Sequence, residues 1–237
     1  MREWTGNGKR TVCGVFVLGL RKSLEYAVWT TLSVRILYVR IGIDRTEEPV
    51  SRSIMPIQII VVPYNPHWPK MFLQERDAIA DALDTSAIAI HHIGSTSIPG
   101  MMAKPLIDIV LEVPDLDSLD AETCAMEQLG YAAMGEFGIP GRRFFRKEND
   151  RAVRTHHVHA FATGDEQIVR HLRFRDFMIA HPEWAKRYAK LKQQVAAAND
   201  EIEGYMEGKD AFIKRADEVA LAWELTGRAK PAPAPAE

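Results

Sequence analysis

The feature that most constrains the fold is a loop of small polar residues between two apolar segments, residues 87–93 and 106–113. Both segments are short and rich in apolar and β-branched residues, which predicts two strands. A single carboxylate, Asp108, lies at the centre of the second segment. An unpaired carboxylate is costly in such surroundings. The sequence therefore predicts a polar turn that leads into a strand with one functional acid.

The loop that begins at Gly94 has the composition of a phosphate cradle. Gly94 permits a close turn, and the hydroxyl groups of the next three residues can donate to a phosphate beside the backbone amides. These three residues are Ser95, Thr96 and Ser97. A surface turn whose hydroxyls cap their own backbone is the alternative. Asp108 favours the functional interpretation, because a carboxylate can hold a metal ion against a bound phosphate.

Histidines and cations elsewhere in the chain are candidates to complete such a site. His157 and His159 lie on one face of a predicted strand, where paired imidazoles can bind a metal, contact phosphate or transfer protons. A structural role or simple exposure is the alternative for this pair. The further candidates for phosphate binding are His92, Lys104, Arg143, Arg175 and Lys209.

The remaining chain mixes strands with helices and then becomes helical. The other predicted strands are residues 57–62, 144–146 and 155–161, and the predicted helices of the first half are residues 68–83 and 116–129. Helices continue from residue 165 to about residue 224, with breaks near Pro182, at 199–200 and at 204–208. This order predicts an α+β fold, a mixed β-sheet with flanking helices and a helical C-terminal half.

The charge distribution and the apolar segments limit the possible partners. Residues 1–54 hold nine Lys/Arg against five Asp/Glu, whereas the rest of the chain holds 21 against 27. An acidic main body argues against a nucleic acid partner, which requires a basic stripe. Charged residues interrupt the apolar N-terminal run, and two cysteines are too few for a disulfide framework. We therefore expect a cytoplasmic protein without a membrane anchor.

The chain divides into three parts by composition. Residues 1–54 form an extension unlike the rest, and we expect translation to begin at Met55, because Met55 directly precedes Pro56 and a predicted strand. Residues 55–227 form the expected folded domain. Residues 228–237 form a Pro/Ala tail that cannot build a core.

Seven ordered motifs carry a family resemblance. They are residues 62–68 (VPYNPHW), 92–100 (HIGSTSIPG), 103–109 (AKPLIDI), 138–143 (GIPGRR), 155–159 (THHVH), 170–176 (RHLRFRD) and 205–209 (YMEGK). Together they resemble the GrpB family, which is placed in the nucleotidyltransferase fold superfamily. The likeness runs from about residue 57 to about residue 222 and leaves the N-terminal extension uncovered.

The resemblance implies a metal site from which this sequence departs. Enzymes of the superfamily usually carry a second acid two residues after the first, so that both bind Mg²⁺, but this chain has Val110 there. Glu112 shares the strand face but lies roughly 13 Å from Asp108 at about 3.3 Å per residue. That distance is too long to share one ion. A ligand from the predicted histidine strand would have to complete the site.

Three functions are expected from these features. The first is a nucleotidyltransferase-like enzyme that takes a nucleoside triphosphate, with Asp108 and His159 as Mg²⁺ ligands and with Asp108, His157 and His159 as catalytic residues. The second is a non-catalytic module for a nucleotide or a coenzyme A derivative, since some family members are fused to dephospho-CoA kinase. The third is a hydrolytic or regulatory protein that uses the histidine pair. In the first two the partner is a small-molecule phosphate ligand.

Overall fold

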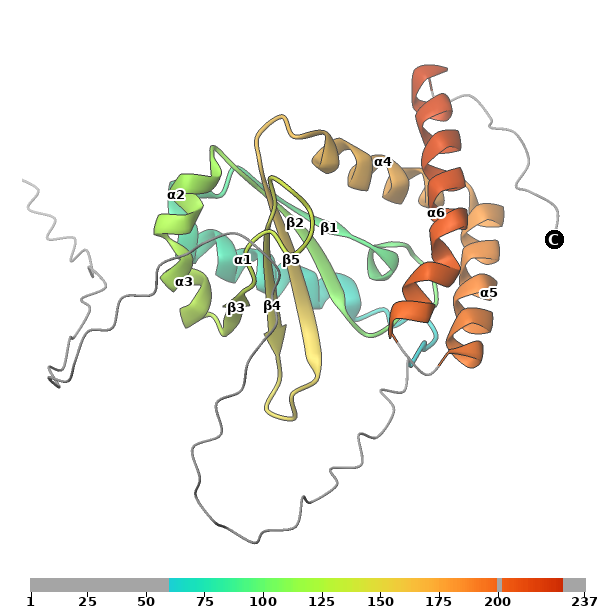
Figure 1. The fold of residues 1–237 in the computed structure, drawn as a ribbon, viewed down its shortest axis with the longest axis horizontal. Helices are drawn as coiled ribbons and strands as arrows, with labels where there is room; N and C mark the ends of the chain where they lie inside the picture. Colours follow the sequence, from blue (N-terminus) through green and yellow to red (C-terminus); the bar gives the residue numbers. More distant parts are fainter. Residues whose placement is uncertain (1–59, 200–201, 228–237) are drawn as a thin grey trace, which may run out of the picture. The chain divides into compact units, whose positions relative to one another are not determined.

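A five-stranded sheet organises the folded part of the chain (Figure 1). The computed structural model describes residues 60–199 and 202–227. The strands are β1 (Ala89–Ile93), β2 (Ile107–Val113), β3 (Tyr131–Ala133), β4 (Arg143–Glu148) and β5 (Arg154–Ala162), in the order β1-β2-β5-β4-β3. β2 and β5 are parallel, whereas the other neighbouring strands are antiparallel. The predicted α+β fold with a mixed sheet is confirmed.

Helices flank the sheet on both faces, as Figure 1 shows. The helices are α1 (Trp68–Leu83), α2 (Leu116–Ala121), α3 (Thr123–Gln128), α4 (Glu166–Ala180), α5 (Pro182–Ala198) and α6 (Ile202–Leu225), with single 3₁₀ turns at Asp84–Ser86 and Ser95–Ser97. The helices α1, α2 and α3 share a core with alternate residues of β2 and β5. On the opposite face, α4 covers the sheet, and α5 and α6 pack against α4. None of the described helices combines the length and the hydropathy needed to cross a membrane.

The alternation of side chains along β2 determines which face carries the predicted site. Ile107, Ile109 and Leu111 are fully buried in the core beneath α1. Asp108 and Val110 therefore point to the other face, where Val110 packs with residues of β5 and α4. The acid of β2 thus lies on the α4 side of the sheet.

Two helix predictions need correction. The helix predicted at 116–129 is two short helices that meet at Glu122, which has φ −102° and ψ 10°. Its carboxylate accepts a hydrogen bond from Ser86 Oγ at 2.9 Å, so a tertiary contact lies at the break. The break predicted at 204–208 is absent from α6. A Cβ at Gly208 would lie 2.6 Å from Val195 Cγ1, so this glycine allows close packing of α6 on α5 rather than ending the helix.

The strand predictions also differ at their ends. The strand predicted at 87–93 is β1, which begins at Ala89. A 3₁₀ turn at Asp84–Ser86 shortly precedes it. Within the described part of the predicted strand 57–62, Val62 forms a two-hydrogen-bond bridge with Ala103. β3 was not predicted, since three residues are too few to show a period. The predictions for the extension, for residues 57–59 and for the tail fall outside the described residues.

Candidate functional site

The parallel pairing of β2 with β5 brings the predicted acid and histidines together. Asp108 lies opposite His157 in the register, and Val110 lies opposite His159. His157 Nδ1 is 3.4 Å from Asp108 Oδ1. One ligating atom from each of Asp108, His157 and His159 lies within 4.8 Å of the other two. The three side chains therefore share one face of the sheet and one small volume.

Burial and neighbouring groups set the charges in this cluster. Burial by itself would raise the pKa of Asp108, but the hydrogen bond and charge of His157, with His159 and His92, hold it below its ordinary value. Burial lowers the pKa of His159 to about 4, although the charge of Asp108 opposes this shift. At neutral pH the cluster thus presents an ionised carboxylate beside a neutral His159 imidazole.

Gly94 closes the predicted loop directly over the carboxylate. Its backbone has φ +68° and ψ −171°, a combination that favours glycine. A Cβ at this position would lie 2.6 Å from Asp108 Oδ2. Ser97 Oγ donates to Gly94 O at 2.6 Å and fixes the turn that follows. The loop is therefore built around the position of Asp108.

A chain of hydrogen bonds holds the other end of the loop. The Thr96 hydroxyl donates to Leu106 O at 3.1 Å. Its oxygen, 3.0 Å from His92 Nε2, then accepts the imidazole N–H. His92 stacks on Phe72 of α1, with ring centroids 4.7 Å apart. His92 therefore orients the loop and does not line the cavity beside Asp108.

A cavity of about 360 Å³ opens beside the cluster. Its lining includes Gly94, Ser95, Thr96, Lys104, Asp108, Arg154, His157, His159, Tyr188, Lys192, Tyr205 and Lys209. Four of these side chains are cationic and one is a carboxylate. Such a balance suits a polyanionic ligand, because Lys and Arg bind phosphate oxygens through charge-assisted hydrogen bonds.

Lys192 is the most informative lining residue that the sequence analysis missed. It is 2% exposed, and its Nζ donates to Ser95 Oγ at 2.9 Å and to Met102 O. Burial, with a smaller effect of the Lys209 charge, lowers the pKa of Lys192 to about 7. Burial also lowers the pKa of Lys209 to about 8. The sequence did hold a signal, since Lys192 lies four residues after Tyr188 on the buried stripe of α5.

Two predicted cations lie in contacts outside the cavity lining. The Arg143 guanidinium binds both oxygens of Asp120, at 2.7 and 2.6 Å. Arg175 donates to His92 O at 3.1 Å and to the adjacent Asp176 at 2.8 Å. Of the predicted basic residues, Lys104 and Lys209 line the cavity. Arg143 and Arg175 instead form intramolecular hydrogen bonds and ion pairs.

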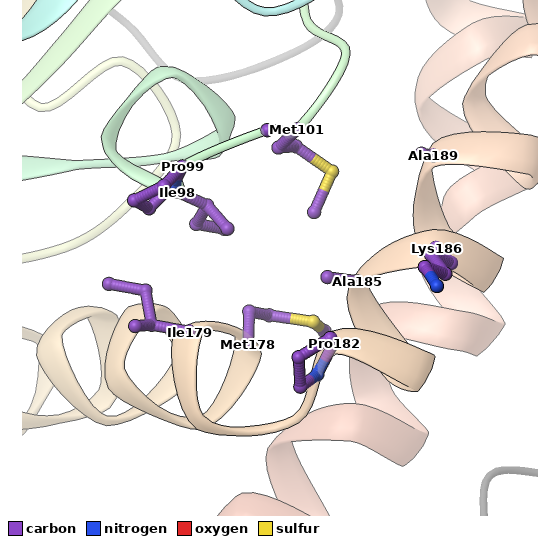
Figure 2. A pocket seen from close by; sticks show the side chains of 10 residues that line it. Ile98, Pro99, Met101, Met178, Ile179, Pro182, Ala185, Lys186 and Ala189 are labelled. Atoms are coloured by element: carbon purple, nitrogen blue, oxygen red, sulfur yellow. The ribbon is translucent and has the colours of Figure 1, made fainter.

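A second cavity, of about 250 Å³, has a different character (Figure 2). It lies between residues 98–101, which follow the Gly94 loop, and the junction of α4 and α5. The side chains of Met101 and Met178 stand on opposite walls, and the remaining lining is apolar apart from Lys186. It contains none of the predicted site residues.

Comparison with known proteins gives consistent matches. Residues 58–218 match the family model described as GrpB protein. The UPF0157 protein YqkA of Bacillus subtilis is 45% identical over 168 residues, or 70% of this chain and 48% of YqkA. The UPF0157 protein PA4798 of Pseudomonas aeruginosa is 38% identical over 168 residues, or 70% of this chain and 69% of that protein. The chain thus spans about half the length of YqkA.

A solved structure agrees with these sequence matches. The crystal structure of the conserved protein GrpB from Enterococcus faecalis has a TM-score of 0.67 and 41% sequence identity to this chain. The match covers 70% of this chain and 99% of the other.

Proposed function

The chain belongs to the GrpB family, and from this premise we propose that its cationic cavity binds the phosphates of a nucleotide. The convergence of four cations on one carboxylate, beside the Gly94 loop, carries this proposal. Ser95 offers a hydroxyl group at the same wall. Lys104, Lys192 and Lys209 would offset the phosphate charge.

The residues around Asp108 fit a divalent cation of the Mg²⁺ type. Mg²⁺ is commonly bound by one or two carboxylates together with substrate phosphates. Asp108 would hold the ion, with His157 and His159 beside it. When bound, the ion would supply positive charge that offsets the charge of the phosphate oxygens.

Nucleotidyl transfer is the reaction that we propose for this arrangement. An acceptor hydroxyl would attack the α-phosphorus in line, and the bond from that phosphorus to pyrophosphate would break as the new P–O bond forms. The proton of the attacking hydroxyl would pass to the solvent at the open side of the cavity. The lysines of the cavity would hold the triphosphate in position and stabilise the developing charge.

A non-catalytic nucleotide-binding module is the second candidate function. Val110, at the position two residues after Asp108, is fully buried in the apolar cluster beneath α4. No second carboxylate belongs to the ligating group formed by the described residues. A pocket that only binds phosphate needs hydrogen-bond donors and positive charge, and it does not need two carboxylates. The single carboxylate therefore favours binding without transfer.

Calorimetry on the full chain separates these functions. We expect ATP, GTP, CTP or UTP to bind, and we expect addition of Mg²⁺ to tighten binding relative to EDTA. Release of pyrophosphate on addition of an acceptor would support the transferase. Mg²⁺-independent binding without turnover would select the module. If none of the four nucleotides binds with or without Mg²⁺, the proposal is wrong.

Phosphate binding should also take up protons at mildly alkaline pH. In the free protein, burial lowers the pKa of Lys192 to about 7 and that of Lys209 to about 8. A bound polyanion raises both pKa values, so the complex holds more protons than the free protein above pH 7. Affinity for tripolyphosphate should therefore rise as the pH falls from about 9 to about 6 and level off below about 6.

Calorimetry in buffers of different ionisation enthalpy measures this uptake. We expect about 1.4 protons per tripolyphosphate at pH 8, because Lys192 is about nine-tenths neutral and Lys209 about half neutral before both become charged. Lys192→Met should lower that number, whereas Lys186→Met, in the second cavity, should leave it unchanged. Equal uptake in wild type and Lys192→Met would exclude Lys192 as the linked group.

A further inference from the structure

Arg142 is a buried cation whose position the surrounding backbone determines. It is 5% exposed and directly precedes β4. Its Nε and Nη2 donate to Glu136 O at 3.2 and 3.1 Å, and its Nη2 also donates to Phe137 O at 2.7 Å. The remaining nitrogen, Nη1, is 3.1 Å from His159 Nδ1. The guanidinium is thus held by two carbonyl groups while it points one N–H at the imidazole.

This contact determines which ring nitrogen of His159 carries a proton. A guanidinium can only donate and keeps its protons in proteins. His159 Nδ1 must therefore accept, and the single proton of a neutral ring lies on Nε2. A second ring proton, at Nδ1, would face an N–H of a fixed cation.

From these contacts we infer that Arg142 is a positioning residue that holds His159 as its Nε2–H tautomer. His159 then serves the cavity as a hydrogen-bond donor and not as a metal ligand. The identity of the acceptor, a phosphate oxygen of the ligand, rests on the proposed function, whereas the tautomer does not. This inference replaces the expectation that His159 binds the cation.

Either ring nitrogen of His159 is a poor metal donor in this setting. A cation at Nδ1 would have to displace the Arg142 N–H. A cation at Nε2 would move the ring proton to Nδ1, where it would oppose the same N–H. Metal-bound histidines instead donate their second N–H to an acceptor such as a carboxylate or carbonyl.

The cation is left with Asp108 and His157. Two donor atoms that bind one ion at about 2.0–2.2 Å lie about 2.8–3.1 Å apart for octahedral angles and about 3.3–3.6 Å apart for tetrahedral angles. The distance between His157 Nδ1 and Asp108 Oδ1 is 3.4 Å. This pair therefore has a spacing that one ion can bridge once the ion displaces the proton that His157 Nδ1 shares with Asp108. The ring proton then lies on His157 Nε2, which is buried and has no hydrogen-bond partner among the described residues, whereas a proton on His159 Nδ1 would face the Arg142 N–H.

Nitrogen NMR of the full chain, labelled with ¹⁵N-histidine, tests the tautomer without any ligand. His159→Asn identifies the His159 signals. We expect wild-type His159 at pH 7 to give the correlation pattern of a neutral ring protonated at Nε2. An Nδ1-protonated or doubly protonated ring would overturn the inference, and this result needs no Arg142 variant to fold.

The role of Arg142 is tested by a matched pair of substitutions. Arg142→Met should lose the preference for Nε2, so that both tautomers or the charged ring become populated. Arg143→Met should leave the His159 pattern unchanged, because Arg143 faces Asp120 instead. An unchanged pattern in folded Arg142→Met would show that Arg142 does not hold the tautomer.

Titration with Mn²⁺ alone tests whether His157, and not His159, binds the cation together with Asp108. We expect His157→Asn to weaken Mn²⁺ binding by about 10- to 100-fold, and His159→Asn to change it by less than about threefold. Equal losses in the two variants would make His159 a ligand and overturn the inference. Absence of Mn²⁺ binding by wild type would count against the metal in the proposed function, while the NMR pattern would still decide the tautomer.

Discussion

Asp108→Asn is expected to weaken Mg²⁺-dependent nucleotide binding by about 100-fold, or about 2.8 kcal/mol. The substitution keeps the shape of the side chain and removes the negative charge that would face the cation. No second acid in the ligating group can compensate, because Val110 occupies the neighbouring position on this strand face. Affinity measured by calorimetry with and without EDTA gives the change.

Glu112→Gln is the matched control for this prediction. Glu112 lies on the same strand and the same face as Asp108, four residues further along β2. It pairs with Ala89 of β1 and does not line the cavity. Its variant should bind nucleotide as wild type does. Undiminished binding by Asp108→Asn, or an equal loss in both variants, would remove Asp108 from the proposed site.

Gly94→Ala is expected to lower the free energy of unfolding by about 3–5 kcal/mol. Two separate effects add at this residue. The backbone, at φ +68° and ψ −171°, lies in a region that residues with a side chain rarely adopt. The new Cβ would also lie 2.6 Å from Asp108 Oδ2, so the carboxylate or the loop must move. Urea unfolding followed by circular dichroism measures the loss.

Gly100→Ala separates strain from steric conflict. Gly100 has φ +76°, but an added Cβ there would meet no atom within 4 Å. We expect a loss of about 1–2 kcal/mol from backbone strain alone. The excess in Gly94→Ala then reports the contact with Asp108, and nucleotide affinity should fall in this variant only. Equal losses in both variants would mean that Asp108 moves aside at little cost.

Much of the candidate site was predictable from local patterns. A two-residue period in β2 and β5 separates Asp108, His157 and His159 from the apolar core residues between them. The family resemblance then implied that these segments belong to one site. Their distances depend on the parallel register of two strands about fifty residues apart in the chain, and no local pattern specifies that register.

The basic residues in and around the cavity were harder to predict, for two physical reasons. Arg142 and Arg143 are adjacent and chemically identical, and the loop before β4 decides that Arg142 turns to His159 while Arg143 turns to Asp120. Lys192 belongs to a helix whose other lysines outside the buried stripe, Lys186 and Lys190, are exposed. Its position on the buried stripe was visible in the sequence, but its partner Ser95 is 97 residues away.

The contact of Lys192 with the loop has a consequence for how this protein can change. α5 contacts the loop between β1 and β2 through the Lys192 ammonium, which donates to Ser95 Oγ and Met102 O. The proposed phosphate site is thus formed by the loop between β1 and β2 together with α5, and a bound phosphate would connect the two. Substitutions that shift α5 would alter ligand preference without touching β2. We therefore expect amino-acid substitutions in α5 and in the loop between β1 and β2 to occur together among related proteins.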